Sequence, residues 1–218
     1  MDSDDPFYGP PANCEQCSRL ADYRAENRAA NPDWFNAPVP SFGDPAAKLL
    51  IVGLAPGVTG ANRTGRPFTG DFAGDLLYDA LLAHGFAEGT YGRSPDDGLA
   101  LRSTVISNAV RCVPPQNKPT GAEIKNCRPY LNGLIETLAE LKAILCLGRI
   151  AHESVMRVFG LRLASHPFAH GAAHLVGGLT VYDSYHCSRY NTNTGRLTEE
   201  MFHAVLAQIR EDLFDAAS

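Results

Sequence analysis

The sequence lacks any apolar run long enough to cross a membrane, since no stretch of its 218 residues approaches the required length of about 18. Its start, MDSDDPFYGPPANC, is acidic and lacks the basic beginning and apolar centre of a secretory signal. We therefore expect a cytoplasmic protein. Apolar residues make up 44% of the chain and charged residues 20%, which suffices for a core and predicts a single domain over residues 1–218.

An excess of positive charge is also absent. The net charge of −5 argues against a protein that binds polyanions over its whole surface. A local basic groove remains compatible with it, because the electric field at the binding face is the one that matters.

Two nucleotide-binding signatures are missing from the glycine-rich stretch KLLIVGLAPGVTGANRTGRPFTGD, residues 48–71. Gly53, Gly57 and Gly60 are too widely spaced for Gly-x-Gly-x-x-Gly, and Pro56 has no amide hydrogen to offer a phosphate. The Gly-Lys-Ser/Thr ending of a P-loop is absent as well. These absences disfavour a nucleotide cofactor in this loop.

The same stretch does contain Phe68 and Asp71. An aromatic ring beside a carboxylate, at the mouth of a strand, suits a planar ligand stacked on the phenyl with an acid over a polar bond. Each residue has a structural alternative. Phe68 could be core packing, and Asp71 could cap the helix that follows it.

Disulfides are not expected among the six cysteines, since cytosolic thiols stay reduced. Cys14 and Cys17 form a Cys-x-x-Cys pair, and Cys112 and Cys127 follow. Four thiolates suit a structural zinc or an iron–sulfur cluster. Zinc ribbons usually carry two Cys-x-x-Cys pairs, so the spacing slightly favours a [4Fe–4S] cluster and leaves zinc open. Cys146, within an apolar strand, is expected in the core.

After an N-terminal segment of 45 residues, apolar runs of strand length alternate with helical patterns, which predicts an α/β fold with a mostly parallel four-stranded sheet. The N-terminal segment carries a helical patch at Ser18–Ala30. The expected strands are Leu49–Gly53, Ser103–Ser107, Ala143–Leu147 and Leu179–Ser184. The expected helices are Phe72–Gly85, Thr120–Leu141, Ile150–Phe159 and Thr198–Phe214.

Polar loops follow three of these four strands. Residues 53–71, 108–120 and 185–196 are rich in glycine, asparagine, arginine and histidine. Ligands of parallel sheets bind beyond the carboxyl ends of the strands, so we expect these loops to meet at one edge and form an active site.

Five segments together resemble the uracil-DNA glycosylase superfamily, and within it family 5, the B type of bacteria and archaea. The resemblance covers nearly the whole chain from Cys14 onwards, and its segments are GLAPG…GANRTGRPFTGD, NAVRCVPPQNKPT, LGRIAHESV, SHPFAHGAAH and SYHCSRYNTNTGRLT. It implies a three-layer α/β/α fold and removal of uracil from DNA by cleavage of the N-glycosidic bond, leaving an abasic site. It also implies a structural [4Fe–4S] cluster held by Cys14, Cys17, Cys112 and Cys127.

The resemblance also implies catalytic residues. Family 4 relatives carry an acidic residue where this chain has Leu54, so Asp71 becomes the carboxylate that would stabilise the sugar cation and orient water. His186 matches the histidine of the second motif and would donate a hydrogen bond to the base carbonyl. Cys187 stands where many relatives have proline. Because neighbouring residues of a strand face opposite ways, we do not expect Cys187 and His186 to form a nucleophile pair.

The segment SHPF at residues 165–168 is not this second motif, because it precedes the last predicted strand. We therefore expect His166, His170 and His174 to be structural or wall residues rather than catalytic ones.

The base and the DNA backbone have their own candidates. Phe68 would stack on the extruded base and Asn108 would read its edge, with Asn117 nearby and the loop at Gly53, Leu54 and Ala55 completing the pocket. Phosphate contacts are expected from Arg63, Arg66, Ser188, Arg189 and Arg196. A solvated surface role competes for each arginine, and a loop-bracing salt bridge also competes for Arg63 and Arg66.

The expected partner is DNA, bound by a monomer. Relatives of this family also resemble one another in accepting hypoxanthine, ethenocytosine and other damaged bases. One alternative is a non-catalytic or abasic-site-binding protein of the same superfamily, although the histidine-bearing insert of such proteins is missing after residue 71. A second alternative is a zinc-stabilised small-molecule hydrolase, because a fold alone does not determine a function.

Overall fold

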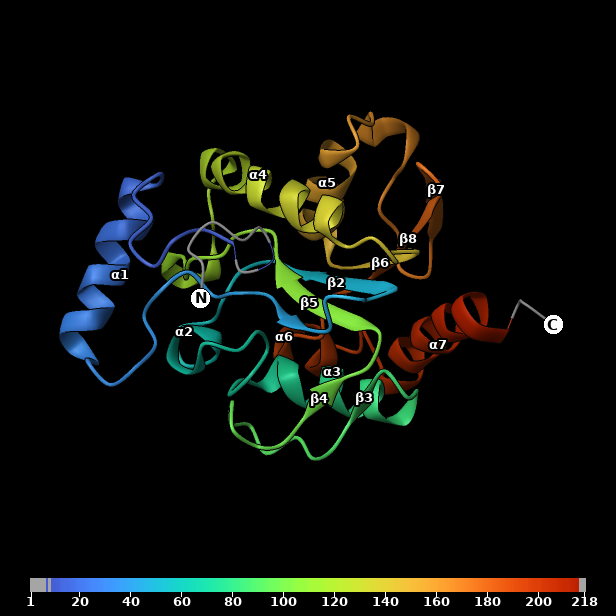
Figure 1. Cartoon of the computed structure of the whole chain (residues 1–218), viewed down its shortest axis with the longest axis horizontal. Coiled ribbons are helices and arrows are strands. Elements are labelled where there is room, and N and C mark those ends of the chain that lie inside the picture. The colour runs from blue at the N-terminus through green and yellow to red at the C-terminus, as the bar shows by residue number, and fades with distance from the viewer. Residues whose placement is uncertain (1–6, 8, 216–218) are drawn as a thin grey trace.

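A six-stranded sheet occupies the middle of the protein (Figure 1). The computed structural model describes residue 7 and residues 9–215. The strand order is β1-β5-β2-β6-β8-β7. The four inner strands run parallel to one another, and they are β2 (Leu49–Gly53), β5 (Thr104–Asn108), β6 (Ala143–Leu147) and β8 (Leu179–Ser184). Three of these ranges match the predicted strands, and β5 is shifted by one residue.

The predicted number of strands is wrong, because a short antiparallel strand is added at each edge of the sheet. β1 (Phe42–Gly43) pairs with β5, and β7 (Ala173–Val176) pairs with β8. β1 has two residues, and β7 exposes Ala173 and Leu175 to solvent. Neither strand carries the continuous apolar run that marks a strand buried on both faces, so sequence patterns do not reveal them.

Helices cover both faces of the sheet and make the three-layer α/β/α arrangement that was expected (Figure 1). On one face, α3 (Phe72–Ala83) and α7 (Glu199–Arg210) pack their apolar sides, including Leu77 and Phe202, on the sheet. On the other face, α4 (Gly121–Thr137) and α5 (Arg149–Val158) do the same with Leu134 and Val155. Every residue of β2, β5 and β6 is buried, as two covered faces require.

The predicted helices exist, but four of them end earlier than expected, at Ala83, Thr137, Val158 and Arg210. α4 stops at Thr137 because Leu138 leaves the helical conformation. Leu138 and Leu141 are nevertheless buried, so they extend the apolar pattern beyond the helix itself. The start of α7 is as predicted, since the Thr198 side chain accepts a hydrogen bond from the amide of Met201 at 3.2 Å.

The remaining elements are short. The N-terminal helix α1 has the predicted bounds, Ser18–Ala30. The others are α2 (Ala61–Thr64), the hairpin of β3 (Ala87–Glu88) and β4 (Ala100–Leu101), α6 (Arg189–Asn193), 3-10 turns at Pro115–Asn117 and Leu163–Ser165, and a π-helical turn at Glu211–Asp215. Among the described residues, no helix is both long and apolar enough to cross a membrane.

Candidate active site

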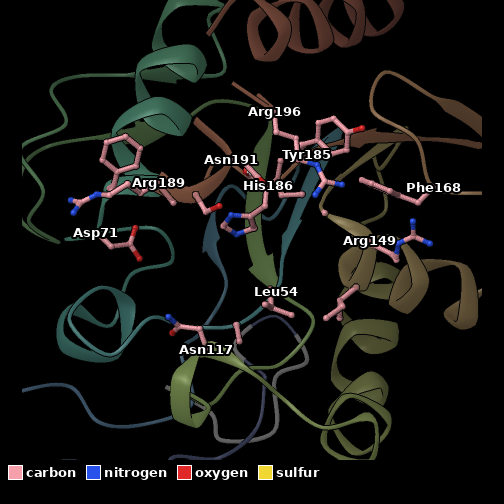
Figure 2. Close-up of a pocket in the computed structure, with 17 residues that line it drawn as sticks. Leu54, Asp71, Asn117, Arg149, Phe168, Tyr185, His186, Arg189, Asn191 and Arg196 are labelled. Atoms are coloured by element: carbon pink, nitrogen blue, oxygen red, sulfur yellow. The ribbon is translucent and has the colours of Figure 1, made fainter. Parts of the chain in front are cut away.

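A cleft of about 590 Å³ opens at the carboxyl edge of the parallel strands, where the polar loops were expected to meet (Figure 2). Figure 2 shows His186 near its centre, with Asp71 on one side and Arg149 and Phe168 on the other. Eight predicted site residues line it: Leu54, Ala55, Asp71, Asn117, His186, Ser188, Arg189 and Arg196. Residues from the loops after β2, β5 and β8 therefore do come together.

Sequence reasoning missed one complete wall of this cleft. Arg149 and Ile150 begin α5, directly after β6 and Gly148, and Phe168 comes from the connection between α5 and β7. The rule about strand ends applies to β6 as much as to its neighbours, so the Gly148–Arg149 pair after this strand was a usable signal. Phe168 gave no such signal, because it follows no strand of the parallel sheet.

Asp71 is both a helix cap and a cleft residue. Its carboxylate accepts a hydrogen bond from the amide of Gly74 at 3.3 Å at the start of α3. A methyl group at Gly60 would lie 2.4 Å from Asp71 Oδ2, and one at Gly57 would lie 3.1 Å away. The two glycines thus make room for the carboxylate. Burial raises the pKa of Asp71, while the amides of Gly74 and Ala73 oppose this shift.

His186 lies on the loop after β8, and its ring stacks on that of Phe68 with the ring centroids 5.7 Å apart. Burial lowers the pKa of His186 to about 4, so its imidazole is neutral at pH 7. Its Nδ1 is buried and has no hydrogen-bond partner among the described residues. The next residue, Cys187, is fully buried in the core, and burial raises the pKa of its thiol, which makes it a poor nucleophile.

Phe68 and Asn108 lie behind the cleft lining, and both pack against Gly53. A methyl group at Gly53 would lie 2.4 Å from Asn108 Oδ1 and 2.6 Å from Phe68 Cζ. The two side chains can approach each other here because the register of β2 and β5 pairs Gly53 with Asn108. Phe68 has a left-handed backbone (φ 54°), and the Tyr91 hydroxyl donates to its carbonyl at 3.1 Å. Such strain is maintained only where the surroundings enforce it.

A second left-handed segment positions Asn117. Gln116 and Asn117 both have φ 56° in the 3-10 turn at Pro115–Asn117, and this conformation directs Asn117 to the cleft. Asparagine tolerates the left-handed region better than most residues, so Asn117 suits this turn.

Arginines on the rim of the cleft are held over aromatic rings. Arg189 lies over Phe72 at 5.1 Å, and Arg196 lies over Tyr185 at 4.5 Å. Both arginines are exposed. A stacked guanidinium has restricted motion but keeps its hydrogen-bond donors for a phosphate.

Two of the predicted phosphate contacts are not on this rim. Arg66 is wrong as a phosphate ligand, because its buried guanidinium forms a two-pronged ion pair with Asp97 at 2.7 and 2.8 Å. This is the loop-bracing alternative. Arg63 is exposed on α2, where its Nη2 lies 3.5 Å from the Gly70 carbonyl, and it does not line the cleft.

The four predicted cysteine ligands surround a separate small cavity beside α1. Cys14 and Cys17 precede α1, Cys112 follows β5, and Cys127 lies in α4. Nitrogen donors face three of the sulfur atoms: Arg24 Nη1 lies 3.4 Å from Cys112, the amide of Arg111 lies 3.3 Å from Cys127, and Asn126 Nδ2 lies 3.7 Å from Cys17. Cys146 is fully buried in the core, as predicted.

Two buried arginines flank this cysteine cavity. Arg24 is 4% exposed and Arg111 is 1% exposed, and among the described residues neither forms an ion pair with a carboxylate. Burial lowers the pKa of Arg111 to about 10, which is still far above neutral pH. A buried positive charge is costly unless negative charge lies near it. Four thiolates bound to iron or zinc would provide that charge, so the donor set fits a thiolate-bound metal group.

The comparisons with known proteins agree with this architecture. Residues 40–210 match the uracil DNA glycosylase superfamily. This chain belongs to that superfamily. It is 46% identical over 204 residues to the type-5 uracil-DNA glycosylase of Thermus thermophilus, covering 90% of this chain and 92% of the relative.

Two further relatives are similar to this chain at lower identity. The type-5 uracil-DNA glycosylase of Pyrobaculum aerophilum is 39% identical over 212 residues, which is 95% of this chain and 92% of that protein. The type-4 uracil-DNA glycosylase of Sulfurisphaera tokodaii is 30% identical over 174 residues, which is 77% and 72%. The predicted resemblance to the superfamily, and to its fifth family, is confirmed.

The buried ion pair predicts a large stability difference between two aspartates. We expect Asp97→Ala to lower the free energy of unfolding by about 3–5 kcal/mol, because it leaves the buried charge of Arg66 without a partner. Asp75→Ala is the matched control, since its partner Arg93 is 66% exposed, and we expect a loss below about 1 kcal/mol. Urea denaturation of both variants measures this. Equal losses would contradict the assignment of Arg66 as a loop brace.

Proposed function

We infer that this protein hydrolyses the N-glycosidic bond of uracil in DNA and leaves an abasic site. The observation that carries this inference is the pairing of a neutral histidine, His186, with a carboxylate, Asp71, in one cleft of a chain of this superfamily. Breaking the bond creates positive charge on the sugar and negative charge on the base. A carboxylate and a neutral hydrogen-bond donor match these two charges.

The base would be bound at the inner end of the cleft. An extruded uracil would stack on Phe68 and hydrogen-bond to the Asn108 amide, two side chains that both pack against Gly53. An amide can pair with the edge of uracil and, in that orientation, faces the wrong donor pattern on cytosine. His186 stacks on the same phenyl ring, which supports a position beside the base carbonyl.

Asp71 would act on the sugar side of the bond. Only the ionised form of its carboxyl stabilises an oxocarbenium-like sugar, and the amides of Gly74 and Ala73 favour that form against the burial that raises its pKa. Its two carboxylate oxygens can also orient the attacking water. The amides at the start of α3 hold one of them in place.

The rim would hold the DNA strand. Arg189, Arg196 and Ser188 line the cleft and would contact the phosphates of the DNA strand that carries the extruded nucleotide. Tyr190 lies between two lining residues and is 71% exposed. A large exposed side chain at this position can fill the gap left in the base stack, which lowers the cost of extrusion.

We propose a [4Fe–4S] cluster rather than zinc for the four cysteines Cys14, Cys17, Cys112 and Cys127. Thiolates on one zinc ion lie about 3.8 Å apart, given Zn–S bonds of about 2.3 Å. Among the described residues, no three of these sulfur atoms lie within 4.8 Å of one another, which supports a larger metal group. Such a cluster would join α1 to α4 and the loop after β5, a structural role.

The volume of the cleft supports a broader range of bases. A space of about 590 Å³ exceeds the need of a single pyrimidine, so purines such as hypoxanthine are candidate substrates as well. The non-catalytic alternative has less support, because Asp71 directly caps α3 at Phe72 and leaves no room for an inserted loop.

Removing the carboxylate should abolish most of the activity. We expect Asp71→Asn to lower kcat for excision of a single uracil opposite guanine by about 100- to 1000-fold. In wild type, kcat should fall as the pH drops towards the raised pKa of Asp71, since protonation removes the charge that stabilises the sugar cation. Asp75→Asn, one turn along the same helix, is the control and should leave kcat unchanged. Full activity of the Asp71 variant would refute its role.

Filling the space at Gly53 should block base binding. Gly53→Ala places a methyl group against Asn108 and Phe68, so we expect kcat/KM to fall by at least about 100-fold while the protein still folds. Gly121→Ala is the matched control, because nothing lies within 4 Å of the new methyl group. The same uracil-excision assay, with circular dichroism for folding, measures both. Unchanged kcat/KM in Gly53→Ala would place the base elsewhere.

Tyr190 should matter only for a base that must leave a duplex. Tyr190→Ala is expected to lower uracil excision from double-stranded DNA by about tenfold and to change excision from single strands little, because stacked bases cost a few kcal/mol to extrude. Phe35→Ala, another exposed aromatic, should affect neither substrate. A similar loss of excision from double-stranded and from single-stranded DNA would contradict a role in extrusion.

The cluster can be tested without measuring activity. Cys127→Ser should lose iron, its brown colour and thermal stability, whereas Cys146→Ser should keep the iron because Cys146 lies in the core away from the cavity. Elemental analysis of the purified proteins decides between the metals. Stoichiometric zinc in colourless wild-type protein would overturn the cluster and favour the zinc alternative.

A further inference from the structure

A buried charged cluster lies outside the proposed chemistry. It consists of His152 in α5, Asp183 in β8 and His174 in β7, which we call the His–Asp–His array. Asp183 is 0% exposed and His152 is 1% exposed. His152 Nδ1 lies 2.8 Å from Asp183 Oδ1, and His174 Nε2 lies 3.2 Å from Asp183 Oδ2. A buried carboxylate flanked by two imidazoles needs an explanation, because desolvation of its charge is costly.

The surroundings of His152 require two protons on its ring. Nδ1 faces the Asp183 carboxylate, and Nε2 faces the carbonyl oxygen of His166, also at 2.8 Å. The carbonyl oxygen is an acceptor, and so is the carboxylate oxygen when Asp183 is ionised, whereas a neutral imidazole has only one N–H. One of the two contacts would then bring lone pairs together in a buried place. His152 is therefore an imidazolium paired with Asp183.

A metal ion is the competing way to place positive charge between these atoms. Ligands around a tetrahedral zinc lie about 3.3 Å apart, given bonds of about 2.0–2.2 Å. The distance of 2.8 Å between His152 Nδ1 and Asp183 Oδ1 is that of a charge-assisted hydrogen bond and is too short for such a ligand pair. The geometry thus favours a proton at this place.

The array joins the segments that build the cleft wall missed by sequence reasoning. His152 lies one turn after Arg149 in α5, and Asp183 lies two residues before Tyr185. His152 holds the carbonyl of His166, and its ring meets that of Phe168 edge-on with the centroids 5.8 Å apart. Figure 2 shows Arg149, Phe168 and Tyr185 together on this side of the cleft.

The connection between α5 and β7, which carries Phe168, is also hydrogen-bonded to the backbone of Asp183. The amide of Gly171 donates to the Asp183 carbonyl at 2.8 Å, and the amide of Asp183 donates to the carbonyl of Ala172 at 2.9 Å. Phe168 also lies under the guanidinium of Arg149 at 5.8 Å. The phenyl ring of Phe168 thus contacts both Arg149, whose charge its π face attracts, and His152, and the two contacts constrain its position.

We propose that the His152–Asp183 ion pair is a positioning device for the cleft: it holds Phe168, and with it the wall formed by Arg149 and Tyr185, against the bound nucleotide. This inference rests on the proposed function, since it assigns the wall to substrate binding. His152 and Asp183 are positioning residues and do not touch the reacting atoms.

The protonation of His152 sets the pH range of this device. The groups that face the ion pair are His174 from β7, His166 from the connection, Cys146 from β6, and Glu153 from α5 itself. Burial opposes the charge on His152, but Asp183 and the His166 carbonyl outweigh it, and the pKa of His152 is raised. The stabilisation is therefore complete below the unfolded-state pKa of about 6.5 and is lost as the pH rises through the folded-state pKa.

The first measurement uses wild-type protein and needs no activity. Nitrogen-15 NMR of the histidine rings, assigned through the signals lost in His152→Gln, should show two protonated ring nitrogens for His152 at pH 7. A single N–H at pH 7 would overturn the proposal, and so would a stoichiometric divalent metal that His152→Gln loses. This measurement decides the ion pair even if a variant fails to fold.

The second measurement follows uracil excision between pH 5.5 and 8.5. In Asp183→Asn, burial of His152 is no longer compensated and its proton is held only at acid pH. The ratio of kcat/KM in Asp183→Asn to wild type should fall by about tenfold as the pH rises. His152→Gln should be impaired at every pH, and the control His203→Gln, on the distant helix α7, should match wild type.

The outcomes separate this inference from the proposed function. A pH-independent ratio in Asp183→Asn would refute the positioning role, even with normal excision by wild type. If wild type excised no uracil, the proposed function would fail, and the ring resonances of Phe168 would replace kcat/KM as the readout. They should shift at a lower pH in Asp183→Asn than in wild type, and Phe168 signals that shift at the same pH in both proteins, or in neither, would overturn the proposal.

Discussion

The register between β2 and β5 is the constraint on which the candidate site depends. It places Gly53 opposite Asn108. Because Gly53 has no side chain, Asn108 and Phe68 can both pack against its backbone. In parallel strands, a shift of one residue turns every side chain to the opposite face. The burial of every residue in both strands prevents such a shift. The hydrophobic core thereby determines the geometry of a polar pocket.

Interior charges hold the loops around this core. Arg66 and Asp97 brace the loop that carries Phe68, and the His152–Asp183 pair fastens the segment that carries Phe168. Arg24 and Arg111 lie beside the cysteine cavity, where the thiolates of the proposed metal cluster would balance their positive charge. Such pairs contribute little net stability compared with apolar packing, but breaking one is costly. Their effect is to make one loop arrangement much more favourable than the others.

Burial also shifts the pKa values of the two groups proposed to act on the substrate, and the two shifts have opposite directions. It lowers the pKa of His186, which stays neutral and can donate a hydrogen bond without carrying charge. It raises the pKa of Asp71, while helix-terminal amides oppose the rise and favour the ionised form. One cleft thus combines a neutral donor with a carboxyl whose ionised form the helix-terminal amides favour, and cleavage of a glycosidic bond calls for both a donor and a negative charge.

Much of this could be predicted from the sequence. Continuous apolar runs marked the four inner strands, since burial on both faces demands them, and loops at their ends indicated where Asp71, Asn117 and His186 would meet. Other features leave no such mark. The edge strands β1 and β7 are short and partly exposed, and Leu138 and Leu141 continue a helical pattern in a segment that is not helical.

Sequence by itself determined the fold class, the parallel core and the loops that carry the chemistry, because these follow from local periodicity. It also determined the family, through the resemblance of its motifs to those of known proteins. Tertiary structure alone decided which arginines face the cleft and which are buried, and it alone brought Phe168, Arg149 and the His152–Asp183 pair to one wall. Partners such as Arg66 and Asp97 are 31 residues apart in the chain. The sequence therefore does not show which opposite charge a buried arginine pairs with, because only the packing of the folded chain brings the two together.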